Sequence, residues 1–141
     1  MATTRTATTN WQGSLLEGSG QVTLESSGVG TYDVTWPSRS EEPNGRTSPE
    51  ELVAAAHSSC FSMALSHALS QQGNPPERLE TTAAVTFQPG EGITGIELRV
   101  RGTVPGITAE QFQEAAEGAK SGCPVSKALA GTTITLDAAL A

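Results

Sequence analysis

The chain contains only two cysteines, Cys60 and Cys123, and their surroundings in the sequence differ. Cys60 lies in the middle of a run of helix-forming residues, where burial raises the pKa of a thiol and the helix dipole gives little help to a thiolate. Cys123 directly precedes Pro124, so the first N–H groups of a new helix would point at its sulfur and favour the thiolate. Local physics therefore favours Cys123 as the nucleophile. An inert thiol is the alternative at both positions.

Two kinds of side chain could activate Cys60. His57 precedes it by three residues on the same helical face and could act as the base of a cysteine hydrolase, although a structural polar contact is the alternative. A cation could instead hold Cys60 as a thiolate. Arg39 and Arg46 lie in the irregular stretch before the helix, and they are two of only eight basic residues.

Composition excludes several classes of function. The 141 residues carry a net charge of −7, which argues against nucleic acid or an anionic membrane surface as a partner. His57 and His67 are ten residues apart, and no Cys-X-X-Cys motif is present, so we expect no metal or other cofactor. No segment is expected to span a membrane, and the first residues lack the apolar core of a secretory signal. We expect a cytoplasmic protein with redox-active cysteines.

The longest predicted element is a helix over residues 48–73. Ser48 is suited to the N-cap, Pro49 to the first helical position and Glu51 to a capping box with Ser48, while Gly73 ends the helix. Small and apolar residues lie nearly all round this helix, which is typical of an element covered on most sides. Because only 36% of the chain is hydrophobic, we expect a second copy to supply part of that cover, and hence a homodimer.

Alternating residues and turn signals predict the other elements. We expect a loop over 37–46, a hairpin, a helix that starts after Thr108 and a short helix that starts at Pro124. The predicted strands cover residues 21–26, 31–36, 81–87, 96–101 and 132–138. This order indicates a single α+β domain over residues 1–141.

Two motifs carry a resemblance to a known family. The run TSPEELVAAAHSSCFSMALS and the later SGCPVSKAL resemble the OsmC branch of the OsmC/Ohr family of thiol-dependent peroxidases, and NWQGSL, VPGI and ITLDA extend the similarity over nearly the whole chain. The resemblance implies an OsmC-like intertwined α+β homodimer. Its antiparallel sheets would pack around a long buried central helix and a second helix, with the active sites at the interface.

The resemblance also implies roles for four residues. Cys60 matches the peroxidatic cysteine, Cys123 the resolving cysteine and Glu50 the catalytic glutamate. Arg39 is the best match to the family's arginine, with Arg46 as the alternative. This assignment reverses the local preference for Cys123 as the nucleophile, and it makes a cation beside Cys60 essential.

The implied activity is the reduction of organic hydroperoxides to alcohols, in defence against oxidative stress. It would proceed through a Cys60 sulfenic acid and a Cys60–Cys123 disulfide, which a dithiol on a lipoyl-bearing protein would reduce. Apolar neighbours of Cys60, such as Phe61 and Met63, would favour alkyl peroxides. Two alternatives are a cysteine hydrolase that uses Cys60 and His57, and a redox-sensing binding module.

Helix geometry adds a constraint on this site. Glu50 and Cys60 are ten residues apart, so a straight helix separates their Cα atoms by about 15 Å, and no proline or glycine between them would cause a kink. We therefore expect a composite site, in which Glu50 and its arginine come from one chain and both cysteines from the other.

Overall fold

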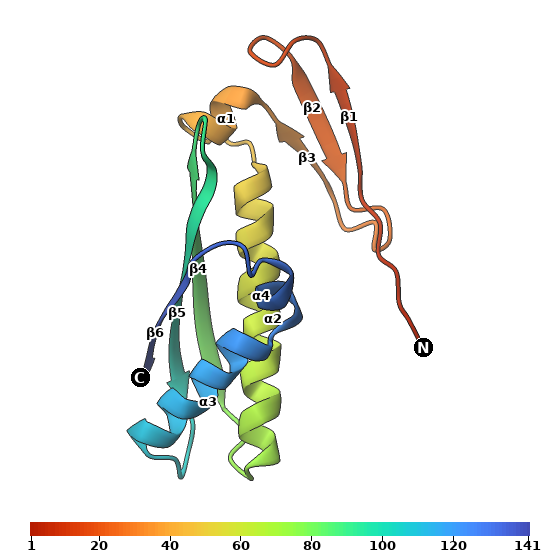
Figure 1. Cartoon of the computed structure of the whole chain (residues 1–141). Coiled ribbons are helices and arrows are strands. Elements are labelled where there is room, and N and C mark those ends of the chain that lie inside the picture. The colour runs from red at the N-terminus through yellow and green to blue at the C-terminus, as the bar shows by residue number, and fades with distance from the viewer. The chain divides into compact units, whose positions relative to one another are not determined.

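The computed structural model describes all 141 residues and divides the chain into two compact units, Met1–Leu52 and Val53–Ala141. The first contains strands β1 to β3 and helix α1, and the second contains β4 to β6, α3 and α4 (Figure 1). Helix α2 (Pro49–Gln71) begins in the first unit and lies mainly in the second. The α+β class is confirmed, and a single domain over residues 1–141 stays a prediction.

The first unit is a small antiparallel sheet in the order β1-β2-β3, followed by a short helix. The strands are β1 (Thr8–Gln12), β2 (Ser19–Thr23) and β3 (Thr31–Val34), and α1 covers Trp36–Ser40. The expectation of a loop over 37–46 is thus wrong at its start. Thr35 and Ser38 form a reciprocal capping box that starts α1, and Pro37 sits in its first turn.

Helix α2 begins at the predicted residue because Ser48 caps it. The Ser48 hydroxyl accepts a hydrogen bond from the Glu51 N–H at 3.1 Å. The predicted capping box is only half formed, since the Glu51 carboxylate accepts a hydrogen bond from the Thr47 hydroxyl. After Gln71 the chain turns at Gly73, whose φ of +84° lies in the left-handed region that glycine adopts without strain.

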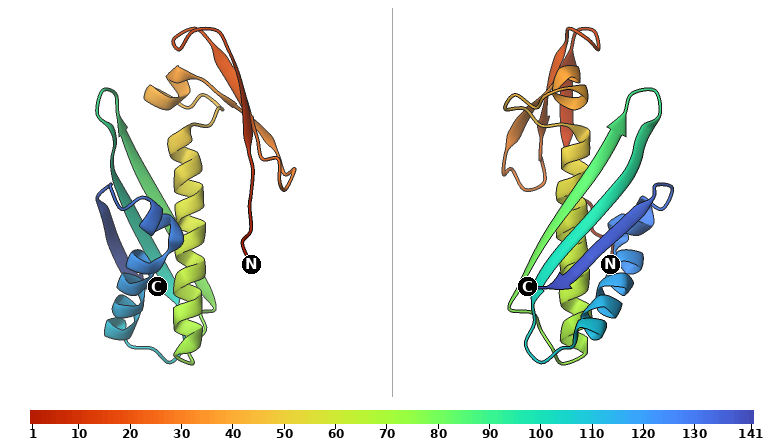
Figure 2. Two further views of the ribbon diagram at one scale, coloured as in Figure 1. Left: turned by 45° about the vertical axis from the view of Figure 1, so that its right-hand side comes forward. Right: turned by 90° about the vertical axis from the view of Figure 1, so that its left-hand side faces the viewer.

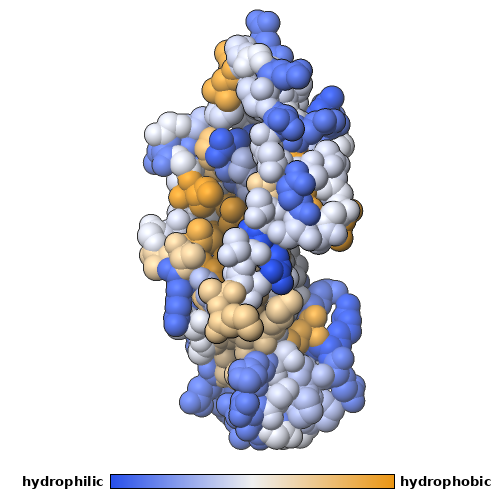
Figure 3. Space-filling model, turned by 90° about the vertical axis from the view of Figure 1, so that its right-hand side faces the viewer, coloured by the Kyte–Doolittle hydropathy of each residue, from blue (hydrophilic) through white to orange (hydrophobic).

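In the second unit α2 buries one stripe at a spacing of four residues, formed by His57, Phe61, Leu65 and Leu69. The opposite face stays exposed in the single chain, where Met63 keeps 72% of its surface. Figure 3 shows hydrophobic residues that reach the surface on the face it draws. The all-round burial expected of this helix is therefore not reached within one chain.

The length and composition of helix α2 would allow it to span a membrane, so the expectation that no segment could do so is wrong. Helix α2 reaches a mean hydropathy of 1.2 over an 18-residue window, because residues 52–71 contain no Asp, Glu, Lys or Arg. Core helices of soluble proteins pass the same test.

The sheet of the second unit has the order β4-β5-β6 and is mixed. The predicted hairpin is present but longer, with β4 (Arg78–Gln88) antiparallel to β5 (Gly92–Thr103). Strand β6 (Ile134–Leu140) runs parallel to β5, which corrects the expectation of purely antiparallel sheets. The reason is that β6 returns after two helices rather than after a tight turn. Figure 2 shows α2 and α3 on the same face of this sheet.

Helix α3 (Ala109–Gly122) starts with the predicted capping box between Thr108 and Gln111. It ends at Cys123, which is also the residue before α4 (Pro124–Ala128). The core of the second unit joins α2, α3 and β5, and its fully buried members include Phe61, Leu65, Leu69, Leu98, Val100, Phe112 and Ala116. Packing of α3 into this core positions Cys123.

Gly102 permits this packing, because a Cβ built there would lie 2.8 Å from the buried Phe112 ring. We expect Gly102→Ala to lower the free energy of unfolding by about 1–3 kcal/mol through overpacking. The matched variant Gly118→Ala, on an exposed turn of α3 with open space around it, should raise the free energy of unfolding by about 0.5–1 kcal/mol. Urea unfolding of both variants measures the difference, and equal effects would contradict the role of Gly102.

Candidate active site

Two thiols that are 63 residues apart in the sequence meet in the second unit. The Sγ atoms of Cys60, on α2, and Cys123, between α3 and α4, lie 2.9 Å apart, and both cysteines are free. Cys60 is partly exposed and Cys123 is fully buried. A disulfide needs about 2.05 Å between the sulfur atoms, so a small side-chain movement would close the bond. The predicted proximity of the two cysteines is confirmed.

The two thiols have opposite electrostatic tendencies. Burial and the hydrogen bond with Cys123 raise the pKa of Cys60, and the Val125 N–H offsets this only in part. Burial also acts to raise the pKa of Cys123, but hydrogen bonds from Cys60, Ser126 and the Val125 N–H outweigh it and lower this pKa. The local preference for a Cys123 thiolate is confirmed. The lowered pKa expected at Cys60 is not produced within one chain, where its neighbours supply no cation.

The His57 side chain is engaged with α4. Its Nε2 lies 2.7 Å from the Ser126 hydroxyl, in a contact where His57 is 0% and Ser126 4% exposed. Burial lowers the pKa of His57, so the ring stays neutral near pH 7. The hydrogen-bond partner of His57 is thus a buried serine. This is the structural polar contact that the sequence offered as the alternative to a catalytic base. Sequence reasoning missed Ser126, although its place two residues after Pro124, in the first turn of a short helix, was a signal.

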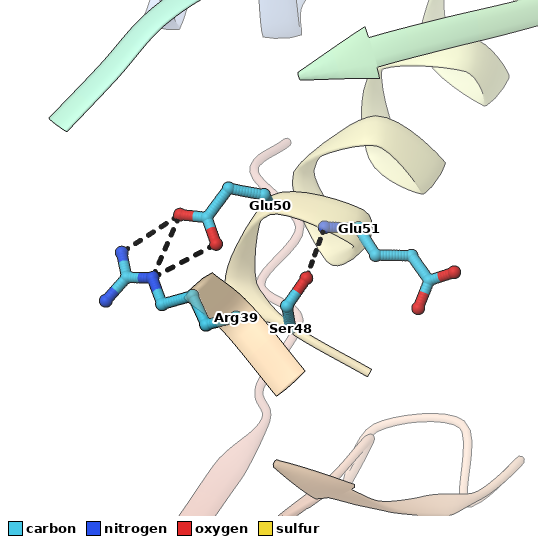
Figure 4. Close-up of polar contacts among 4 residues, drawn as sticks. All are labelled: Arg39, Ser48, Glu50 and Glu51. Carbon is cyan, nitrogen blue, oxygen red and sulfur yellow. Dashed lines mark hydrogen bonds and ion pairs between the residues drawn. The ribbon is translucent and has the colours of Figure 1, made fainter. Parts of the chain in front are cut away.

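In the first unit Arg39 and Glu50 form a bidentate ion pair, drawn in Figure 4. Arg39 Nε donates to both carboxylate oxygens at 3.0 and 3.1 Å, and Nη2 donates to Oε2 at 2.9 Å. Glu50 is only 7% exposed, so the guanidinium compensates a buried charge. The Arg39 guanidinium carbon also lies 6.0 Å from the centroid of the Trp36 ring.

Arg46, the alternative arginine, lies in a different part of the same unit. It lines a polar pocket together with Asn10, Gln21 and Asp33. The arginine that the structure pairs with Glu50 is therefore Arg39.

An apolar pocket of about 340 Å³ lies beside Arg39 within the first unit. Its walls include Trp11, Leu15, Val22, Val34, Trp36, Pro49 and Leu52. Of the two apolar neighbours of Cys60 expected to favour alkyl peroxides, Phe61 is fully buried in the core and Met63 is exposed, and their effect on the substrate stays a prediction. No three His, Cys, Asp or Glu side chains of the chain gather in a group that could hold a metal ion.

Comparison with known proteins shows the family of this chain. Residues 42–137 match the family model described as OsmC-like protein. Over 131 residues the chain is 42% identical to the peroxiredoxin OsmC of Escherichia coli K12, which covers 91% of this chain and 90% of that protein. It is 32% identical over 106 residues to the organic hydroperoxide resistance protein OhrB of Bacillus subtilis, covering 74% of this chain and 77% of that protein.

Solved structures share the fold. The crystal structure of Bacillus subtilis OhrB superposes with a TM-score of 0.68 at 27% identity, covering 96% of this chain and 98% of that one. An organic hydroperoxide resistance protein OsmC from Legionella pneumophila gives a TM-score of 0.70 at 24% identity, with 95% and 96% coverage. On the family match and the 42% identity over nine-tenths of its length, the chain belongs to the OsmC-like protein family.

Proposed function

We propose that this chain is a thiol peroxidase that reduces organic hydroperoxides and serves in defence against oxidative stress. The observation that carries the proposal is the pair of free thiols 2.9 Å apart, one partly exposed and one buried. Such a pair can receive an oxidising equivalent at the exposed sulfur and pass it to the buried one. The relatives, which include a peroxiredoxin and an organic hydroperoxide resistance protein, support the same reaction class.

The cycle begins at Cys60, because a peroxide can reach only the exposed sulfur. The Cys60 thiolate attacks one peroxide oxygen, the O–O bond breaks, and the alkoxide takes a proton and leaves as the alcohol, so that Cys60 becomes a sulfenic acid. The Cys123 thiolate then attacks the Cys60 sulfur. The S–O bond breaks, hydroxide takes a proton and leaves as water, and the disulfide forms.

A dithiol restores the two thiols by exchange. One of its thiolates attacks the exposed Cys60 sulfur and releases the Cys123 thiolate, and its second thiol then releases Cys60 and leaves as a cyclic disulfide. We propose that a lipoyl group on a partner protein provides this dithiol, and that the cycle runs in the cytoplasm. On this chain the proposed redox chemistry uses only the two cysteine thiols.

Cys60 needs a cation that its own unit does not supply, since its pKa is raised there. Arg39, oriented by the buried Glu50, is the cation that we assign to this role. The continuous helix α2 separates Glu50 from Cys60 by ten residues, or about 15 Å of rise, which exceeds the reach of a glutamate side chain. We therefore propose a homodimer in which Arg39 and Glu50 of one chain meet Cys60 of the other.

Two further features support the dimer and its substrate class. The exposed apolar face of α2 provides a surface that a second copy can cover, and burying Met63 alone would contribute about 1.5–3 kcal/mol. The apolar pocket beside Arg39 is suited to the alkyl or aryl group of an organic hydroperoxide. A small polar oxidant such as hydrogen peroxide gains nothing from such walls.

The first prediction concerns the resolving step. We expect Cys123→Ser to consume about one equivalent of cumene hydroperoxide and then stop, because its Cys60 sulfenic acid has no thiol to condense with. The wild type should lose two hydrogens within one chain on oxidation and turn over repeatedly with dihydrolipoamide, as mass spectrometry and a peroxide assay would show. A redox-sensing module would form the disulfide without sustained turnover, and disulfides that form only between chains would contradict the cycle.

The second prediction concerns the charge beside Cys60. A neighbouring guanidinium stabilises the thiolate and so lowers the pKa of Cys60; without it, the pKa should return to the raised value that burial imposes. In Arg39→Ala the rate of peroxide reduction should therefore fall at pH 7, and the rate should begin to rise only at higher pH. Each unit by which the pKa rises lowers the thiolate fraction at pH 7 by about tenfold. Arg46→Ala is the matched control and should leave the pH profile unchanged. The reverse pattern would identify Arg46 as the arginine.

The third prediction tests the composite site by subunit mixing. Cys60→Ser and Glu50→Ala homodimers should each be inactive, the first without a nucleophile and the second without an oriented arginine. In a mixed dimer one of the two sites regains Glu50, Arg39 and both cysteines, so about half of the activity per mixed dimer should return. The control exchanges wild-type subunits under the same conditions. Mixed dimers that remain inactive while the control survives would place the site within one chain.

A further inference from the structure

The contact between His57 and Ser126 has no part in the cycle described so far, although it lies directly beside the thiol pair. Both side chains are buried, and the bond between them joins α2 to α4 at 2.7 Å. Ser126 lies three residues after Cys123 and its side chain lowers the pKa of that thiol, and the Sγ atoms of Cys123 and Cys60 lie 2.9 Å apart. These four side chains form a cluster that extends from the buried histidine to the partly exposed Cys60.

We propose that Ser126 and His57 are positioning residues for Cys123, and that they direct a hydroxyl hydrogen at its sulfur so that Cys123 acts as a thiolate in the redox cycle. The proposal rests on the peroxidase function proposed above. The proposal gives Ser126 and His57 a part in two steps of the cycle, and both steps involve the Cys123 thiolate. Cys123 is the thiolate nucleophile when it attacks the sulfenic acid, and it is the thiolate leaving group when the dithiol opens the disulfide.

The number of hydrogens that each group can donate fixes the direction of the proposed hydrogen bonds. A serine hydroxyl carries one hydrogen, and it can stabilise a Cys123 thiolate only by donating that hydrogen to the sulfur. The Ser126 oxygen must then accept from His57, which places the ring proton on Nε2. A neutral ring has only this one N–H, so Nδ1 carries a lone pair; Nδ1 is buried and has no hydrogen-bond partner in the chain. The imidazole thus serves as a fixed donor to Ser126 rather than as a base for Cys60.

The electrostatics of the two sulfurs agree with this direction. Hydrogen bonds from Cys60 and Ser126 overcome the effect of burial and lower the pKa of Cys123, whereas burial raises the pKa of Cys60. Besides Cys123 itself, the titratable side chains in this network are Cys60 and His57, both on α2. Without the hydroxyl, a fully buried thiolate would lose one of its few donors.

The first test isolates Cys123 in a Cys60→Ser background, where ultraviolet absorbance reports the titration of the single remaining thiol. Ser126→Ala should raise the pKa of Cys123 by about one unit or more, since a hydrogen bond to a charged group has that order of strength. The matched control is Ser62→Ala, which removes a partly buried hydroxyl on α2 that donates a hydrogen bond to the Thr81 hydroxyl. This control should leave the Cys123 titration unchanged.

The second test follows single turnovers of the otherwise intact chain with cumene hydroperoxide. In Ser126→Ala the consumption of peroxide should keep its rate, while formation of the Cys60–Cys123 disulfide slows by about tenfold and a dimedone-trappable sulfenic acid accumulates. His57→Leu should behave like Ser126→Ala. His57→Gln keeps an N–H near the position of Nε2 and should restore most of the rate, and thermal melts verify that all variants are folded.

The outcomes separate this inference from the proposed function. If Ser126→Ala changes neither the Cys123 titration nor the rate of disulfide formation, the contact is only structural and the inference is wrong. If the wild type never forms the intramolecular disulfide, the proposed peroxidase cycle fails, and the titration in the Cys60→Ser background still decides whether Ser126 and His57 support a Cys123 thiolate.

Discussion

The thiol pair depends on the burial of one stripe of α2. Phe61, Leu65 and Leu69 on this stripe join the core that α3 and β5 complete, and His57 lies one turn before Phe61 on the same face. Truncating a buried phenylalanine costs about 3–5 kcal/mol, whereas a hydrogen bond contributes about 1 kcal/mol. Hydrophobic packing therefore decides where the helices lie, and the sulfur contact follows from it. The polar groups refine a geometry that the core has already imposed.

The Arg39–Glu50 ion pair of the first unit and the thiol pair of the second unit are stabilised in different ways. Glu50 is a buried carboxylate, and without Arg39 its charge would be uncompensated at a cost of several kcal/mol. The bidentate pair thus holds the arginine in one orientation for structural reasons. Cys123 is fully buried, and its pKa is lowered by neutral donors, namely Cys60, Ser126 and the Val125 N–H. Burial and the neighbouring Cys123 thiol raise the pKa of Cys60, and the Val125 N–H offsets this only in part, which is why the proposed cycle assigns Cys60 a cation from outside its own unit.

The apolar character of α2 has a related physical origin. Its residues after Glu51 include no Asp, Glu, Lys or Arg until the helix ends, so one face can enter the core while the other, which combines Ala55, Ala56 and Met63 with Ser59 and His67, stays exposed without acidic or strongly basic side chains. This is why hydropathy alone cannot distinguish a membrane span from a core helix here. An exposed apolar face of this kind is typical of a surface that a further protein chain covers.

Local signals in the sequence determined where the main elements begin. Ser48, Thr108 and Pro124 start the helices that were predicted, since caps and prolines act through neighbouring backbone groups, and alternation predicted the hairpin. The same locality allowed one part of the lowered pKa of Cys123 to be anticipated, the part that the N–H groups of Val125 and Ser126 contribute, whereas the hydrogen bond from Cys60 comes from tertiary packing. Only the tertiary structure decided the rest: the parallel register of β6, the 2.9 Å contact between the sulfurs, and the engagement of His57 with Ser126, 69 residues away. Such contacts arise from the packing of whole elements, and no residue carries that information in its own neighbourhood.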